Sequence, residues 1–204
     1  MTALRADDLR NHSDVLRLHS GQRLTLRFVE PGDADALQAY VRGLSASSRY
    51  RRFHGAASEL PPGLLQGFTH AGVDDRFSVI AVAAVEGHQR IVAEARYALT
   101  ADQAGVEFGL SVDDRWQRQG IGAALVTHLE CRAAALGATT LFGDALRSND
   151  VMIALARKSG FALVHSPGDW KLVRFEKRIA LAQDTPCASW RRVASSRQIA
   201  QQAV

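Results

Sequence analysis

The alternation of apolar and polar residues predicts a strand near the start of the chain, followed by a series of short helices. Residues 24–29 alternate between the two kinds, as expected of a strand whose successive side chains point to opposite faces. Apolar positions three or four residues apart then predict helices over residues 31–44, 45–54 and 61–68. Residues 1–20 are polar with scattered leucines, and we expect a peripheral helix there.

Three strands with short connections are predicted next. Residues 77–85 form a nearly unbroken apolar run, which is typical of a central strand. Over residues 91–99, Ile91 shares one face with the other odd-numbered apolar residues, while the even-numbered Glu94 points the other way. Residues 106–112 alternate in the same manner. Because two successive connections are short, these strands should form an antiparallel meander.

The second half of the chain alternates helices and strands. Helical spacing over residues 120–136 stops at Gly137, a residue type that tolerates the positive φ of a helix end. Strands are then predicted over residues 139–145, 161–164 and 170–179, with a helix over residues 151–158 after the first of them. This order predicts an α/β fold with one mixed, mostly antiparallel central sheet flanked by helices.

Periodicity ends after Leu181, which suggests a division into three parts. We expect an N-terminal extension over residues 1–20, one domain over residues 21–181 and a flexible C-terminal tail over residues 182–204.

Composition narrows the classes of function. The chain is 47% apolar and 23% charged, and it has no apolar run long enough to span a bilayer. Acidic residues interrupt the first twenty positions where a signal peptide would be apolar, so we expect a cytoplasmic protein without a membrane partner. A net charge of +4 favours an anionic ligand, and no nucleic-acid motif is visible, so we expect no nucleic-acid partner. Cys131 and Cys187 lack metal-ligand spacing, and no metal is expected.

The stretch Gln117–Ala123 carries the strongest chemical signal, because it joins an alternating strand to a helix. Backbone N–H groups at such a helix start can hold a phosphate, and Gly120 and Gly122 remove side chains that would keep it away. A Rossmann fingerprint is excluded because its third glycine would fall at Leu125, and no Walker A lysine follows. The remaining alternative is a plain strand-to-helix turn.

The same stretch has the form Gln-x-x-Gly-x-Gly, which resembles the pyrophosphate motif of GCN5-related N-acetyltransferases. Two further segments are similar to that family, namely residues 141–152 with Asn149 opening a helix, and residues 156–161 ending in Gly-Phe. The resemblance extends over residues 24–179, and within the family it is greatest to the bacterial protein-lysine acetyltransferase type. It implies acetyl-CoA as cosubstrate.

The resemblance also implies which residues bind coenzyme A. Backbone N–H groups of the loop would hold the diphosphate, with added contacts from the side chains of Gln117 and Arg118. If the strand over residues 106–112 splays from its neighbour, its free backbone groups can bind the pantetheine arm as an added strand would. Asn149 is either a helix cap, a pantetheine contact, or both. The expected cofactor-binding residues are Leu110, Val112, Gln117, Arg118, Gln119, Gly120, Ile121, Gly122, Ala123 and Asn149.

Glu107 is the candidate general base, as glutamate at this strand position often is in the family. We expect it to be partly buried in mid-sheet, which favours proton transfer near neutral pH; the alternative is a structural ion pair with Arg96. The N–H of Leu110 is the candidate oxyanion donor. The family's general-acid tyrosine is missing, because Ala156 stands at the aligned position. Two weaker substitutes are Tyr97 and Ser148.

These expectations define an acetyl-CoA-dependent N-acetyltransferase that transfers an acetyl group directly to a primary amine. A protein lysine is the first choice of acceptor. Two alternatives stay open: a small-molecule amine, with an enclosed acidic pocket for a small cation, or a non-catalytic acyl-CoA-binding module. The arginine-rich residues 49–54 are either part of the acceptor side or a solvated helix face, and a homodimer is compatible with the sequence.

Overall fold

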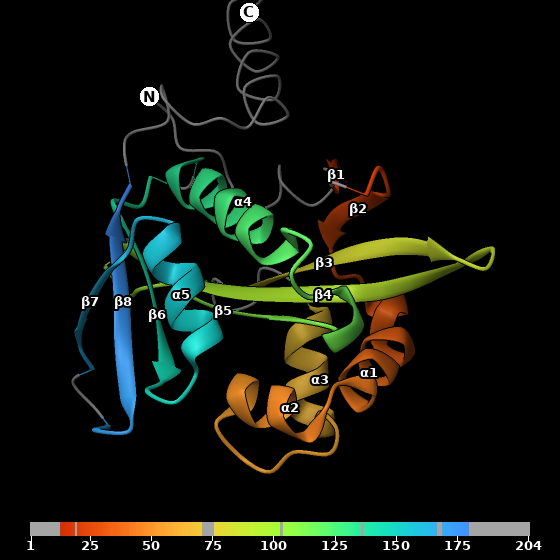
Figure 1. The fold of residues 1–204 in the computed structure, drawn as a ribbon, viewed down its shortest axis with the longest axis horizontal. Helices are drawn as coiled ribbons and strands as arrows, with labels where there is room; N and C mark the ends of the chain where they lie inside the picture. The colour runs from red at the N-terminus through yellow and green to blue at the C-terminus, as the bar shows by residue number, and fades with distance from the viewer. Residues whose placement is uncertain are drawn as a thin grey trace, which may run out of the picture.

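The computed structural model describes residues 13–18, 20–70, 76–102, 104–135, 137–166 and 169–179. Within this part of the chain, eight strands form one sheet in the order β1-β2-β3-β4-β5-β6-β8-β7 (Figure 1). The strands are β1 (Asp14–Arg17), β2 (Arg23–Phe28), β3 (Arg76–Val85), β4 (His88–Leu99), β5 (Gly105–Val112), β6 (Thr140–Leu146), β7 (Ala162–His165) and β8 (Leu172–Arg178). All neighbouring pairs are antiparallel except β5 and β6. The predicted fold class is confirmed.

Helices cover both faces of this sheet. On one side lie α1 (Ala34–Gly43), α2 (Ala46–Phe53) and α3 (Pro62–Thr69); on the other lie α4 (Ile121–Ala135) and α5 (Asp150–Lys158) (Figure 1). Two short 3-10 helices, η2 (Pro31–Asp33) and η4 (Asp114–Trp116), precede α1 and the loop before α4. The core accordingly divides into two clusters, one against α4 and α5 and one against α1 and α3.

A β-bulge in β4 changes the face of one predicted core residue. The register between β3 and β4 shifts between Ala81 and Val82, so that Val92 has no opposite partner. Ile91 therefore joins the cluster under α1 and α3, whereas Ala93 joins the opposite cluster. The prediction that Ile91 shares a face with the later odd-numbered residues of this strand is wrong, because periodicity cannot foresee the extra residue.

The segment before β2 also differs from its prediction. Residues 14–17 form β1, an edge strand paired with β2, and are not helical. The sheet thus extends into the expected N-terminal extension. Residues 1–12 and the expected C-terminal tail, residues 182–204, lie outside the described residues.

The feature of the fold that positions the site is the short contact between β5 and β6. The two parallel strands pair only from Gly105–Thr140 to Glu107–Phe142. Beyond this point β5 continues along β4 and β6 continues along β8, so the two strands diverge. Backbone groups of β5 that face β6 therefore lose their strand partner from Phe108 onward.

Candidate active site

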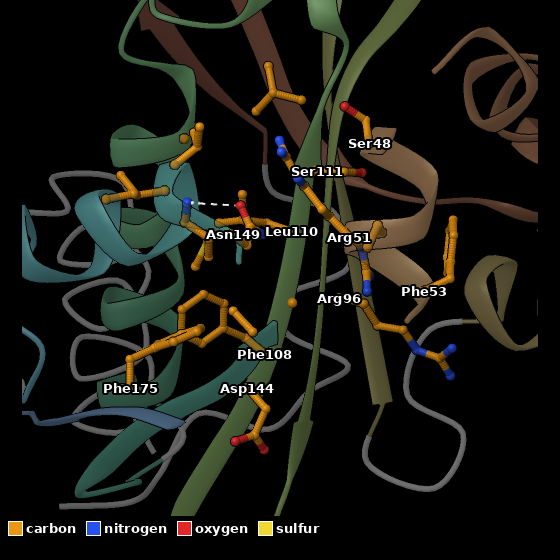
Figure 2. A pocket seen from close by; sticks show the side chains of 18 of the residues that line it. Ser48, Arg51, Phe53, Arg96, Phe108, Leu110, Ser111, Asp144, Asn149 and Phe175 are labelled. Atoms are coloured by element: carbon orange, nitrogen blue, oxygen red, sulfur yellow. Dashed lines mark hydrogen bonds between the residues drawn. The ribbon is translucent and has the colours of Figure 1, made fainter. Parts of the chain in front are cut away.

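A cavity of about 830 Å³ lies where β5 and β6 diverge. Its lining includes both faces of the sheet: Phe108, Asn149 and Phe175 lie on one side of β5, whereas Phe53 and Arg96 lie on the other (Figure 2). The residues on the first side come from β5, α4, α5 and β8. Those on the second come from α2, α3 and β4. One cavity thus connects two chemically different sides through the opening in the sheet.

The loop before α4 forms one end of this cavity. Arg118 and Gly120 adopt positive φ values of +61° and +85°. The first helical hydrogen bond of α4 runs from Ala124 N–H to Gly120 C=O, which leaves the preceding N–H groups outside the helix ladder. Among the described residues, none of the backbone N–H groups from Arg118 to Ala123 has a protein acceptor. Successive free N–H groups at a helix start form an anion-binding concavity.

Glycine is required at Gly120 and Gly122 for different structural reasons. A Cβ on Gly120 would meet nothing within 4 Å, so backbone conformation alone accounts for glycine there. A Cβ on Gly122 would approach Leu155 Cδ2 to 3.1 Å, so the small size of this residue also lets α4 approach α5. The packing requirement at Gly122 was not foreseen from the sequence.

The side chain of Gln117 is directed back toward β5. Its Nε2 donates to the carbonyl oxygen of Val112 at 3.1 Å. This bond fixes the loop to the end of the strand and satisfies one of the two Val112 backbone groups that sequence analysis assigned to pantetheine. Side-chain contact of Gln117 with a diphosphate stays a prediction, as do the contacts expected of Arg118, Gln119 and Ile121.

Backbone alternation places Leu110 toward the opening. Asp113 N–H donates to Val92 C=O, and Gly105 C=O accepts from Thr100 N–H, so odd-numbered residues of β5 direct their backbone groups to β4. The N–H and C=O of Leu110 therefore face the gap left by β6. This orientation is the one required of a donor to a ligand lying between the strands.

Asn149 borders the same gap and caps α5. Its Oδ1 accepts from Met152 N–H at 3.2 Å, and the residue is 9% exposed (Figure 2). Because the oxygen serves the helix, the Nδ2 group is left as a donor toward the cavity. The capping role is confirmed, and the pantetheine contact stays a prediction.

Three packed aromatic rings support the cavity at the point of divergence. The centroids of Phe108, Phe161 and Phe175 lie 5.4–5.8 Å apart. Gly143 of β6 lies beside them, and a Cβ on it would be 2.6 Å from both the Phe108 carbonyl oxygen and Phe175 Cζ. Glycine at this position therefore permits the close approach of β5 and β6 immediately before they separate.

Glu107 lines the cavity at the last residue pair between β5 and β6. Its cross-strand neighbour on β4 is Ala98, and no ion pair with Arg96 forms among the described residues. The side chain is exposed, so the expected partial burial in mid-sheet is wrong. A side chain on a sheet face is buried only where another element packs over it, and alternation within a strand does not show where that occurs.

The buried carboxylate of this face is instead Glu94, which sequence analysis did not single out. Glu94 is 2% exposed and accepts two hydrogen bonds from Arg52 of α2, at 3.1 and 3.0 Å. The guanidinium crosses the backbone at Gly109, where an added Cβ would lie 2.9 Å from Arg52 Nη1. Residues 42 positions apart meet here, and no local sequence pattern signals such a pair.

A second contact joins α2 to the segment before the loop. Asp114 of η4 accepts hydrogen bonds from the backbone N–H of Ser45 and from the hydroxyls of Ser45 and Ser48, at 2.7–3.0 Å. Burial opposes ionisation of Asp114, but these hydrogen bonds outweigh it and hold its pKa below the usual value. The arginine-rich helix α2 thus borders the cavity in a fixed position, with Arg51 and Arg52 among the lining residues.

The possible general acids named from the sequence are poorly suited to protonating a thiolate, although Tyr97 lines the cavity. Ala156 is 1% exposed and packs in the core, and Ser148 does not line the cavity. Tyr97 is 1% exposed and stacks on Phe77 at 5.0 Å, and burial raises its pKa. A buried phenol with a raised pKa gives up its proton reluctantly.

Metal clusters and membrane-spanning helices are both absent from the described residues. No group of three or more histidine, cysteine, aspartate or glutamate side chains lies close enough together there to hold a metal ion. Within the same part of the chain, every helix is too short or too polar to cross a membrane.

Comparison with known proteins agrees with this geometry. Residues 44–161 match the model of the acetyltransferase (GNAT) family. Acetyltransferase PA5475 of Pseudomonas aeruginosa is 25% identical over 155 residues, which cover 76% of this chain and 83% of that protein.

Solved structures have the same fold. The GNAT domain of S. lividans PAT superposes with a TM-score of 0.74 at 24% identity, covering 86% of this chain and 99% of that domain. The structure of yncA from Salmonella typhimurium, which contains its cofactor acetyl-CoA, has a TM-score of 0.61 at 16% identity, covering 81% and 98%. The family match spans more than half of the chain, from the start of α2 to the start of β7, and the chain therefore belongs to the acetyltransferase (GNAT) family.

Proposed function

We propose that this acetyltransferase binds acetyl-CoA in the gap between β5 and β6 and transfers the acetyl group directly to a primary amine. The observation that carries the proposal is the alignment of unpartnered donors along one path. The free N–H groups from Arg118 to Ala123 stand at one end, and Leu110 faces the gap farther along β5. Pyrophosphate at the loop and pantetheine along β5 would satisfy these groups in turn.

The amine reaches the thioester from the other face of the sheet, past Glu107. Its nitrogen attacks the carbonyl carbon while a proton passes to Glu107, directly or through a water molecule. The Leu110 N–H stabilises the negative charge that develops on the carbonyl oxygen. Collapse breaks the carbon–sulfur bond, and the coenzyme A thiolate leaves and takes a proton from water.

The class of amine that the sequence favours is a protein lysine. The cavity opens on the acceptor face, and the exposed Glu107 lies on the path from this face to the proposed thioester position. This arrangement is compatible with an extended lysine side chain. Positioning of two substrates on opposite sides of one opening would supply much of the rate.

The test is a coenzyme A release assay with a panel of lysine peptides and small amines. Glu107→Gln should lower kcat by about 100-fold or more, the usual range for a lost general base, with acetyl-CoA affinity retained. Glu176→Gln, an exposed strand residue outside the cavity, is the matched control and should have wild-type activity. Wild-type turnover in the Glu107→Gln variant would contradict the assignment of the base. Acetyl-CoA binding without turnover of any amine would indicate a non-catalytic module.

A further inference from the structure

The acceptor side of the cavity is lined by arginines that carboxylates neutralise only in part. Arg51, Arg52, Arg76 and Arg96 all line it. Arg52 is held by Glu94, but none of the other three forms an ion pair within the described residues.

The carboxylates of the same side do not balance this charge. Glu107 and Asp144 line the cavity, and Asp144 already accepts hydrogen bonds from Nε and Nη2 of Arg174, at 3.2 and 2.7 Å. The acceptor side therefore carries an excess of positive charge. An acidic pocket for a small cation, considered from the sequence as one alternative, is not what these residues form.

Arg96 has the setting of an anion-binding group. Its guanidinium lies over the Phe68 ring at 4.5 Å, beside Gly67, where an added Cβ would be 3.4 Å from Nη2. Burial lowers the pKa of Arg96, and the positive charge of Arg76 acts in the same direction. A partly desolvated cation next to a second cation gains more from an anionic partner than a fully solvated one does.

Strand register places Arg96 next to the proposed base. Arg76, Ala98 and Glu107 form one row across β3, β4 and β5, and Arg96 lies opposite Gly109 in the next row. Side chains two residues apart on a strand share a face, so Arg96 and Glu107 are diagonal neighbours, with Cβ atoms roughly 7–8 Å apart. Gly109 has no side chain of its own, and the Arg52 guanidinium lies over its backbone.

We propose that the acceptor carries an anionic group, such as a carboxylate, close to its reactive amine, and that Arg96 binds this group with help from Arg76. The proposal rests on the proposed function, because it assigns the substrate class of the same site. The amine would stand at Glu107 while the carboxylate pairs with the guanidinium in the next row. Two sources share this chemistry: a free amino acid, and a protein lysine flanked by acidic residues.

The test uses pairs of acceptors that differ in the anion and are compared at equal concentrations of the unprotonated amine. Leucine and leucinamide form one pair, chosen because Leu64 and Phe68 supply an apolar wall. A short peptide with glutamate on both sides of a lysine, and the same peptide with glutamine, form the other. The wild-type enzyme should prefer the anionic member of one pair by about tenfold or more in kcat/KM, the range of a hydrogen-bonded charge. The pair that shows the preference identifies the source.

Variants then assign the preference to residues. Arg96→Gln should reduce it to within about threefold, chiefly by raising KM for the anionic member of the pair. Arg76→Gln, an exposed position, should reduce it less. Arg23→Gln removes the same charge from an exposed residue of β2 outside the cavity and should leave the preference intact.

Product binding, measured by calorimetry with coenzyme A present, keeps the test independent of turnover. N-acetylleucine or the acetylated acidic peptide should bind at least about tenfold more tightly than its neutral counterpart, and Arg96→Gln should remove the difference. Equal kcat/KM and equal product binding in both pairs would overturn the anion site, and turnover of neutral amines would then still support an acetyltransferase. Anion-selective product binding without turnover of any amine would support the anion site and contradict the proposed function.

Discussion

Two glycines at opposite ends of α4 provide a matched test of whether the loop before α4, residues 118–123, binds the diphosphate of acetyl-CoA. Gly120 precedes the helix with φ +85°, and Gly137 follows it with φ +82°. A Cβ on either residue would meet nothing within 4 Å, so alanine meets no steric clash at either site. Only the backbone conformation is penalised, and only Gly120 borders the cavity.

The magnitude follows from the cost of the left-handed conformation. An L-residue other than glycine loses about 1–2 kcal/mol there, and both variants should lose up to that amount of unfolding free energy. Nothing packs against the exposed loop at position 120, so alanine allows it to relax. Binding of a diphosphate must then restore the original turn, which raises the Kd for acetyl-CoA by roughly 5- to 30-fold.

Calorimetric titration of acetyl-CoA and thermal unfolding of both variants test this expectation. Gly120→Ala should bind more weakly, whereas Gly137→Ala should bind like the wild type even though its Tm falls comparably. Wild-type acetyl-CoA affinity in Gly120→Ala would refute the assignment of the loop as the diphosphate site. Equal weakening in both would show that the affinity loss comes from general destabilisation.

Two further variants separate overlapping roles. Asn149→Asp keeps an acceptor for the Met152 N–H, so Tm should change by only a few degrees. Because the variant removes the Nδ2 donor and adds a negative charge, calorimetric titration should show about tenfold weaker binding of acetyl-CoA. Unchanged affinity would leave Asn149 with the role of a helix cap only. The hydrogen bonds from Arg27 lower the pKa of Asp33 in the folded protein. The stabilisation by this pair is therefore complete above the pKa of Asp33 in the unfolded state, near 3.9, and is lost as pH falls through the lower pKa of the folded state. Asp33→Asn should cost about 1 kcal/mol at neutral pH and flatten the acid side of the stability profile measured by urea unfolding, and parallel profiles for the two proteins would contradict this.

The sequence was most informative where the physics is local. Alternation located β5, helical spacing located α4, and the paired glycines located the turn between them, because each depends on residues a few positions apart. Asn149 could be predicted as a cap for the same reason. Positive φ at Gly120 and Gly137 also follows from the residue type and its place at a helix end.

What could not be predicted depends on long-range contacts or on one extra residue. The bulge at Val92 reverses the face of Ile91 without any change in composition. The exposure of Glu107 depends on which elements pack over that face of β5, which the alternation within β5 does not reveal. The pairing of Arg52 with Glu94 joins α2 to β4 across a space that Gly109 leaves open.

The central claim is that the opening between β5 and β6, together with the free amides of the loop, forms the coenzyme A site. A crystal structure of the complex with acetyl-CoA tests it most directly. The account predicts pyrophosphate oxygens within about 3.2 Å of backbone nitrogens between Arg118 and Ala123, and pantetheine hydrogen-bonded along β5 at Leu110. Acetyl-CoA bound elsewhere, with β5 and β6 closed over the gap, would contradict it.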